Sequence, residues 1–281
     1  MSSRSPALRT DRSTRYPSKQ WDGLSTRPLP SIRRADSCTK QDRNIVPHAK
    51  VPGSGFYRFI PDEDGNLRAG GRLQALAVLN QPNYNTSTGQ GLGKTLPVTW
   101  VDIDDPDPAG AEENPSAVFE QGLRKGAAIF QRLEGCWYGD GSIHFNATTG
   151  GDAGLGQVWQ YRPSGPPSRQ LEAEVTGTLT LIFESPGRDF LEHPDNITVS
   201  PRGGVVLCED SREYQFLRGL TPHGEIFDLV RTSGHSTEFA GATFSPGGEI
   251  LFFNIQGSTV REMTAVGHTF AMWGPWEEGA L

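Results

Sequence analysis

The sequence predicts an all-β fold of the β-propeller type, and two observations carry that prediction. The first is a unit that occurs three times, at residues 134–142, 194–204 and 238–248. Each copy has an acidic or polar residue, a small residue, an apolar strand, a glycine-rich turn and a second apolar strand, and successive copies are 61 and 45 residues apart. Such spacing with a hairpin per unit is typical of propeller blades. The second observation is the composition, because 34 glycines, 21 prolines and only 35% hydrophobic residues favour a turn-rich β fold.

The segments before the first unit are predicted as a hairpin, a further strand and a helix. An aromatic-rich run at residues 55–60 ends at the turn Pro61-Asp-Glu-Asp-Gly65, and residues 71–79 follow as the second strand of the hairpin. Residues 97–103 read as another strand. The only helix that we expect spans residues 116–125.

From residue 126 onward the sequence indicates strands and turns throughout. Hairpin turns recur at residues 139–141, 201–204, 222–224 and 246–248, each with glycine or proline. The strands that we expect lie at 128–133, 142–146, 157–162, 178–184, 197–200, 205–209, 216–221, 226–230, 243–245 and 250–255.

Several single residues are predicted to be structural. His144 alternates with apolar neighbours and is expected to face outward from its strand, whereas His193 and His268 are expected in turns. Four tryptophans, Trp137, Trp159, Trp273 and Trp276, are expected to pack between strands. Cys136 and Cys208 lie in or beside apolar runs and are interpreted as buried free thiols, because neither has a second ligand at metal-binding spacing.

The net charge of −7 conceals an asymmetry along the chain. Residues 1–50 hold 11 Lys or Arg against 4 Asp, so the remainder carries −14. A strongly acidic globular part is expected to bind nucleic acid poorly and to favour the binding of divalent cations. No segment approaches the ~18 consecutive apolar residues of a membrane helix, so no membrane span is expected.

The chain is predicted to divide into a disordered basic leader at residues 1–50 and a propeller domain at residues 51–281. The leader has no hydrophobic periodicity and is rich in Ser, Arg and Pro. It contains the pair Arg33-Arg34, but polar residues follow where a twin-arginine export signal needs an apolar run. The sequence as written is therefore expected to lack an export signal.

Many short strings, in the same order, resemble the PhoX-type alkaline phosphatases. The resemblance is close over residues 126–256 and looser over 53–79 and 94–125. The strings that carry it include Phe130-Gln-Arg-Leu-Glu-Gly-Cys-Trp-Tyr138, Gly156-Gln-Val-Trp-Gln-Tyr161, Pro194-Asp-Asn196, Ser200-Pro-Arg-Gly-Gly204, Leu207-Cys-Glu-Asp210, Leu217-Arg-Gly-Leu-Thr-Pro222 and Glu238-Phe-Ala-Gly-Ala-Thr-Phe-Ser-Pro246. The resemblance implies a six-bladed propeller that hydrolyses small phosphate monoesters with a calcium and iron cluster in its channel, in a protein exported to the periplasm or beyond.

The sequence departs from that family's pattern in one respect. The Asn-His-Glu motif and the cysteine-containing Pro-Trp-Gly-Thr region of the family's N-terminal half are not found, so the resemblance covers only the C-terminal two-thirds of such a protein. We therefore expect an incomplete propeller, weakened or lost turnover, and no iron-binding role for Cys136 or Cys208. Open sheet edges, where further blades would close the ring, are expected to favour pairing with another strand.

The repeated unit and the resemblance together indicate a metal site in the propeller channel. The first strand of each blade lines that channel, and Glu134 and Asp195 occupy the same place in their units, so both carboxylates should converge. Ca²⁺ prefers six to eight oxygen ligands. The predicted ligands are Glu134, Asp195, Asn196, Glu209 and Glu238, with Fe³⁺ as the family's second metal. Glu238 lies two residues before the equivalent place in its unit.

Each of these residues also has a structural interpretation. Glu134, to which we give a catalytic role as well, could pair with Arg132, and Asp195 could form an Asx turn. Either Glu209 or Asp210 could face the channel, and Glu209 is preferred. Arg218 is predicted to bind phosphate through its planar guanidinium, although a buried ion pair with Glu209 or Asp210 would explain it equally well.

The leading functional hypothesis is a metal-dependent phosphomonoesterase of the PhoX type. Two alternatives stay open at this point. One is a propeller module that binds calcium without catalysis, and the other is a lactonase-like propeller hydrolase that also uses channel carboxylates and calcium.

Overall fold

A computed structural model of the chain describes residues 53–164, 177–232, 237–257 and 266–281. The predicted leader at residues 1–50 lies outside this part, so the division at residue 51 stays a prediction. The described residues form strands β1 Tyr57–Pro61, β2 Gly71–Val78, β3 Thr95–Asp102, β4 Leu133–Gly139, β5 Ser142–Ala147, β6 Gln157–Pro163, β7 Gly177–Glu184, β8 Pro194–Val199, β9 Val205–Glu209, β10 Phe216–Leu220, β11 Ile226–Arg231, β12 Phe239–Phe244, β13 Ile250–Ile255 and β14 His268–Trp273, the helix α1 Ala117–Arg124 and the 3-10 turn η1 Leu67–Ala69.

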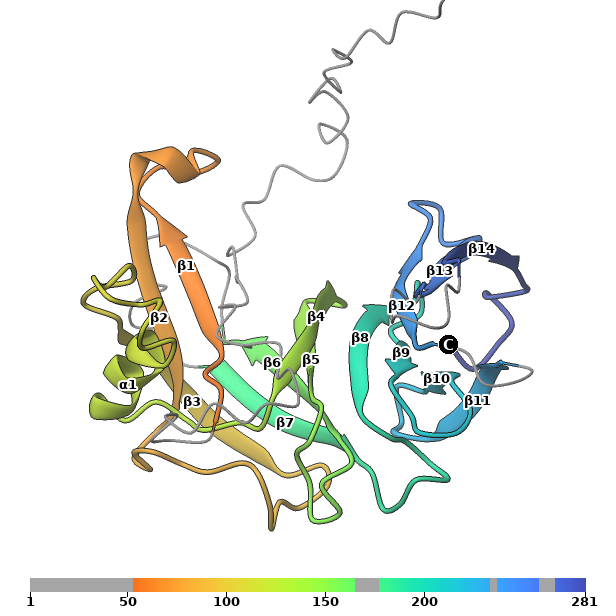
Figure 1. The fold of residues 1–281 in the computed structure, drawn as a ribbon, viewed down its shortest axis with the longest axis horizontal. Coiled ribbons are helices and arrows are strands. Elements are labelled where there is room, and N and C mark those ends of the chain that lie inside the picture. The colour runs from red at the N-terminus through yellow and green to blue at the C-terminus, as the bar shows by residue number, and fades with distance from the viewer. Residues whose placement is uncertain (1–52, 165–176, 233–236, 258–265) are drawn as a thin grey trace, which may run out of the picture.

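The strands form three antiparallel sheets, which confirms the all-β prediction. A seven-stranded sheet has the order β1-β2-β3-β7-β6-β5-β4 and curls strongly from one edge to the other (Figure 1). The second sheet has the order β11-β10-β9-β8, and the third has the order β12-β13-β14. Within the second and third sheets each strand pairs with its neighbour in sequence, which is the up-and-down connectivity of propeller blades.

The first strands of the three predicted units lie side by side at the edges of their sheets. Strand β4 packs against β8, and β8 packs against β12. Two glycines permit the close approach of β4, since a Cβ on Gly135 would lie 2.7 Å from the carbonyl oxygen of Asp195 and a Cβ on Gly139 would lie 2.5 Å from Val199. The described residues therefore form part of a propeller ring, with β4, β8 and β12 as its innermost strands.

Apolar side chains fill the space between neighbouring sheets. An aromatic cluster under the seven-stranded sheet includes Phe56 stacked on Phe145, with ring centroids 4.2 Å apart. A second cluster joins β7 to the four-stranded sheet, and a third joins that sheet to β12 and β13. Burial of these faces fixes the positions of the inner strands, because each sheet presents one apolar face to the next.

Most predicted elements are confirmed, with two exceptions at strand level. Helix α1 and the strands at 205–209 and 250–255 lie where the sequence predicts them. The strand expected at 128–133 is wrong, because β4 begins only at Leu133 and the preceding residues make isolated bridges to Ser54 and Asn85. Strand β14 is not predicted, because the sequence indicates a turn at His268.

Three side-chain predictions are also wrong. His144 is 2% exposed, because all six residues of β5 are buried and the strand therefore has no outward face. Trp273 is 69% exposed at the end of the edge strand β14, and Trp137 is 38% exposed on the inner strand β4. Only Trp159 of the four tryptophans is fully buried.

Among the described residues, no helix has both the length and the apolar character needed to cross a membrane. Helix α1 spans eight residues and buries Phe119 and Gly122. Gly122 brings the helix onto strand β2, where a Cβ would lie 3.2 Å from Ala75. Helix α1 thus covers the part of the seven-stranded sheet that is remote from β8 and β12 (Figure 1).

Candidate metal centre

Acidic residues from separate strands meet where the three inner strands begin. Asp195 is the second residue of β8, Glu238 directly precedes β12, and Asp210 directly follows β9. Each of these three residues offers a carboxylate oxygen, and the three oxygens lie within 4.8 Å of one another. Glu134, the second residue of β4, is close enough to raise the pKa of both Asp195 and Glu238. We call Asp195, Asp210 and Glu238 the carboxylate triad.

Each inner strand has a bulge close to its acidic residue. The register with the neighbouring strand shifts between Leu133 and Cys136 in β4, between Pro194 and Asn196 in β8, and between Ala240 and Thr243 in β12. A bulge places two residues opposite one and redirects the side chains beside it, and bulges are enriched next to active sites. The local backbone of all three strands therefore departs from regular pairing where the carboxylates converge.

The carboxylate triad carries more negative charge than its surroundings compensate. Burial, together with the charges of Glu134 and Asp210, raises the pKa of Asp195 to about 6 against the opposing effect of Arg132. Burial also raises the pKa of Glu238 to about 7, with contributions from Asp210 and Asp195. Because these shifts arise from desolvation and mutual repulsion, a bound cation would relieve both causes.

The donor set fits a hard cation. Three carboxylates offer up to six oxygens, and Ca²⁺ takes six to eight oxygen ligands. The thiol of Cys208 lies near enough to feel the charges of Asp195 and Glu238, but burial raises its pKa to about 12, so the group is a neutral thiol. The chemistry of this group of residues therefore favours an oxygen-liganded ion such as calcium.

Polar residues behind Asp195 hold the start of β8 in place. Thr148 Oγ1 donates to Asp195 Oδ1 at 3.3 Å and to the carbonyl oxygen of Pro194 at 2.8 Å. Asn146 Nδ2 donates to the same carbonyl at 2.9 Å. Asn196, a predicted ligand, instead accepts the backbone N–H of Gly241 through Oδ1 at 2.6 Å. Its side chain thus ties β8 to β12 beside the carboxylate triad.

Strained backbone precedes two of the inner strands. Arg132, just before β4, has φ of 47°, and His193, just before β8, has φ of 49°. A left-handed conformation in a residue other than glycine costs roughly 1 kcal/mol or more and is concentrated at functional sites. The Arg132 guanidinium lies 3.8 Å from Glu134 Oε1 and is 41% exposed, so it is a cation that a substrate can reach beside the carboxylates.

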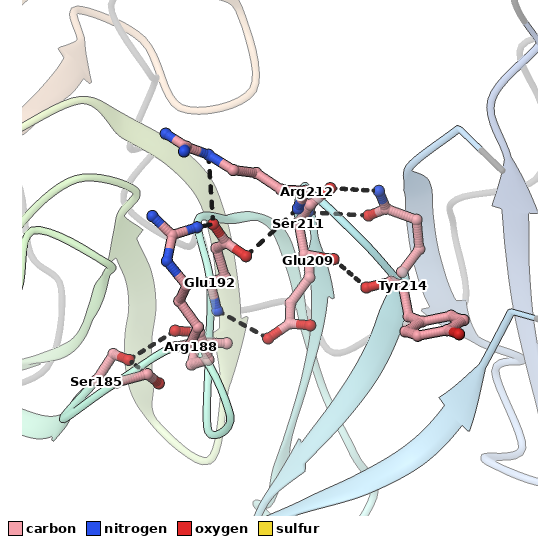
Figure 2. Close-up of polar contacts among 10 residues, drawn as sticks. Ser185, Arg188, Glu192, Glu209, Ser211, Arg212 and Tyr214 are labelled. Atoms are coloured by element: carbon pink, nitrogen blue, oxygen red, sulfur yellow. Dashed lines mark hydrogen bonds and ion pairs between the residues drawn. The ribbon is translucent and has the colours of Figure 1, made fainter. Parts of the chain in front are cut away.

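Two of the predicted residues, Glu209 and Arg218, lie outside the carboxylate triad and form a buried ion pair. Arg218 Nε lies 3.0 Å from Glu209 Oε1, and the same oxygen accepts the backbone N–H of Glu192 at 2.8 Å. Arg218 also pairs with Asp228 and lies over the ring of Phe216. Burial raises the pKa of Glu209 to about 7, while Arg218 lowers it. Figure 2 shows the Glu209 carboxylate directed toward Glu192.

The structure therefore groups the predicted residues in two sets. Asp195 and Glu238 come together with Asp210, and Glu134 lies beside them, whereas Glu209 and Arg218 pair with each other. The sequence favours Glu209 over Asp210 for the channel, but two adjacent acids at a strand end give no signal of which one faces inward. The sequence indicates Arg132 only as a partner of Glu134, and its positive φ has no sequence signature.

A comparison with protein families identifies a family for this chain. The family model of the alkaline phosphatase PhoX matches residues 50–258, which is most of the chain. The chain belongs to the PhoX alkaline phosphatase family. Searches of curated proteins and of solved structures found no significant match. Membership of the PhoX family supports a phosphatase-like hydrolase function in general, small phosphate esters as substrates and a dependence on metal ions, with the carboxylate triad as a group able to bind a metal.

Proposed function

We propose that this PhoX-family protein is a phosphomonoesterase whose metal site is built on the carboxylate triad. The observation that carries the proposal is the convergence of Asp195, Asp210 and Glu238 within 4.8 Å at the start of the inner strands. These acids come from separate segments, and burial works against the charges of Asp195 and Glu238. Such an arrangement is unfavourable without a cation, which supports a binding role over a purely structural one.

Calcium is the proposed ion at the carboxylate triad, with Glu134 as a further ligand from β4. The Glu134 carboxylate is the one predicted ligand on β4, and its charge raises the pKa of both Asp195 and Glu238. Asn196 and Glu209 have other partners and are assigned to the support of the site. A second metal, Fe³⁺ in the family, remains part of the proposal without a ligand set among the described residues.

Hydrolysis of a phosphate ester requires positive groups that neutralise the charge on the phosphoryl oxygens, and an activated oxygen nucleophile. When bound, the cation supplies charge neutralisation and lowers the pKa of a water molecule. The carboxylate triad holds and orients that cation. We assign phosphate binding to Arg132, because its guanidinium is accessible and adjacent to Glu134. Arg218, the residue predicted for this role, is 3% exposed and already paired with two carboxylates.

The test is hydrolysis of p-nitrophenyl phosphate by the purified full chain, with Ca²⁺ and Fe³⁺ supplied and with chelator as a control. We expect a chelator-sensitive rate that Asp195→Asn and Glu134→Gln abolish and that Arg132→Gln weakens mainly through a higher KM. The matched control is Asp104→Asn, because Asp104 is an exposed acid paired with Lys125 near α1. A rate that survives Asp195→Asn, or that Asp104→Asn reduces equally, would refute the assignment.

The same assay separates the alternative functions. A protein that binds Ca²⁺ through Asp195 but hydrolyses no ester is a non-catalytic calcium-binding module. A protein that opens lactones in a calcium-dependent reaction, without inhibition by inorganic phosphate, is a lactonase-like hydrolase. A phosphatase is expected to be inhibited by its product phosphate, because Arg132 and the cation bind both substrate and product.

A further inference from the structure

Two loops lead directly into the carboxylate triad, and a pair of buried glutamates connects them. The first loop joins β7 to β8 and carries Glu192 three residues before Asp195. The second joins β9 to β10, where Glu209 immediately precedes Asp210. The glutamates are 4% and 0% exposed, respectively. Their contacts therefore act within a few residues of two members of the carboxylate triad.

The hydrogen bonds between these loops are reciprocal. The backbone N–H of Glu192 donates to Glu209 Oε1 at 2.8 Å, and the backbone N–H of Arg212 donates to Glu192 Oε2 at 3.3 Å. Each glutamate carboxylate thus accepts a backbone donor from the opposite loop. A third bond runs from the backbone N–H of Asp210 to the carbonyl oxygen of His193 at 3.1 Å. Figure 2 shows the first two contacts and the ion pairs of Glu192 with Arg188 and Arg212.

Arginines neutralise both buried carboxylates. Glu192 Oε1 pairs with Arg188 from its own loop and lies 3.9 Å from the guanidinium of Arg212 in the other. Arg218 pairs with Glu209 from β10. Buried ion pairs add little net stability compared with apolar residues of similar size, because desolvation offsets their attraction. The fixed geometry between the loops therefore comes from the reciprocal backbone hydrogen bonds.

We propose that Glu192 and Glu209 are positioning residues that set the separation of Asp195 and Asp210 for cation binding. This inference rests on the proposed function of the carboxylate triad. Glu192 lies in the first loop and contacts the second at two points. Its backbone N–H donates to Glu209, and its carboxylate accepts the backbone N–H of Arg212. It also lies beside His193, whose left-handed backbone needs support from its neighbours. Residues behind a metal site commonly change metal affinity 10- to 100-fold when they are removed.

The test compares Ca²⁺ binding by calorimetry in three variants of the full chain. Glu192→Ala removes the acceptor, Glu192→Asp keeps the charge but withdraws the oxygens by one methylene, and Glu192→Gln keeps an oxygen for the Arg212 N–H without the charge. We expect Glu192→Ala to weaken Ca²⁺ binding about 10- to 100-fold, Glu192→Asp to weaken it as well, and Glu192→Gln to stay nearest the wild-type protein. A purely electrostatic effect on the cation would give the opposite order for the Asp and Gln variants and would overturn the proposal.

Gln121→Ala is the matched control for lost loop contacts. Gln121 on α1 is 9% exposed and holds a remote loop through two bonds to the backbone of Asp105, at 2.9 and 2.7 Å. We expect this variant to lower Tm without changing Ca²⁺ affinity. If Glu192→Ala lowers Tm in the same way and binds Ca²⁺ within about twofold of the wild-type protein, the glutamate is structural only and the proposal fails.

Amide hydrogen exchange in EGTA gives a readout that needs no metal. Glu192→Ala is expected to speed exchange at the N–H groups of Asp210 and Arg212, whereas Gln121→Ala is expected to leave them protected. Unchanged protection in Glu192→Ala would show that the loops are not held by this residue and would overturn the proposal. If the wild-type protein binds no Ca²⁺, the proposed function fails and the positioning role fails with it. Unaltered Ca²⁺ affinity in Glu192→Ala, in a wild-type protein that does bind Ca²⁺, overturns the positioning role alone.

Discussion

Replacement of Asp195 by asparagine is predicted to stabilise the metal-free protein while it destroys the metal site. Asp195 lies among other carboxylates, and its pKa rises from 3.8 to about 6 through burial and the charges of Glu134 and Asp210. Asparagine has nearly the same shape and no charge, and its side-chain oxygen can still accept the hydrogen bond of Thr148. The variant thus removes the repulsion with little change in packing.

The size and pH dependence of the effect follow from the shifted pKa. Each pKa unit corresponds to about 1.4 kcal/mol, and because Asp195 and its neighbouring carboxylates share the repulsion we expect roughly 1 to 3 kcal/mol. The folded protein binds the proton more tightly than the unfolded chain, so ionisation destabilises the fold as pH rises. The cost is fully present above about pH 7, where the folded group is ionised, and absent below about pH 4. Asp195→Asn should therefore stabilise at pH 8 and have little effect at pH 4.

Thermal melts monitored by circular dichroism in EGTA measure this directly. We expect Asp195→Asn to raise Tm by several degrees at pH 8 and by much less at pH 4.5. Asp104→Asn, which changes an exposed acid, should leave Tm nearly unchanged at both values. Added Ca²⁺ should raise the Tm of the wild-type protein more than that of Asp195→Asn. A lower Tm for Asp195→Asn at pH 8, or an equal shift at the two pH values, would refute the view that unrelieved charge strains this site.

Three further predictions concern the framework around the site. Burial lowers the pKa of His144 to about 4, so the stability that the neutral side chain provides above pH 6.5 is lost as pH falls toward 4. His144→Gln should therefore reduce the loss of unfolding free energy between pH 7 and pH 5, measured in urea, by roughly 2 kcal/mol. Arg218→Met leaves the Glu209 carboxylate buried without its cation and should lower the free energy of unfolding by roughly 3 to 5 kcal/mol, whereas a loss below 1 kcal/mol would mean that the pair is not buried in solution. Gly135→Ala places a Cβ 2.7 Å from the backbone of Asp195 and should cost roughly 1 to 3 kcal/mol and weaken Ca²⁺ binding, while wild-type behaviour would show that β4 and β8 do not pack as described.

The sequence was sufficient to predict the blade-like strands, because glycine-rich turns and apolar runs are local signals. The positions of β9 and β13 and of helix α1 are confirmed to within one residue. The alignment of Glu134 with Asp195 predicts that their carboxylates converge, and the contact between β4 and β8 shows that the strands carrying them are neighbours. Periodicity could not predict β14, whose residues are nearly all exposed.

Burial was harder to predict than strand position. His144 alternates with apolar residues, which usually indicates an outward face, but β5 is covered on both sides. Likewise, Glu209 and Asp210 are adjacent at the end of β9 and differ only in direction. Which of them meets Arg218, and which meets Asp195, depends on the bulge in β8 and on the loop that follows β9. Neither feature has a signature in a single sequence.

The most direct test of the metal centre is a crystal of the full chain soaked in Mn²⁺, a hard divalent cation that anomalous scattering can locate. We predict an anomalous peak between the carboxylates of Asp195, Asp210 and Glu238, and no peak there in crystals of Asp195→Asn. A peak elsewhere, or none at millimolar Mn²⁺ with the carboxylates still converging, would contradict the assignment of this site to metal binding.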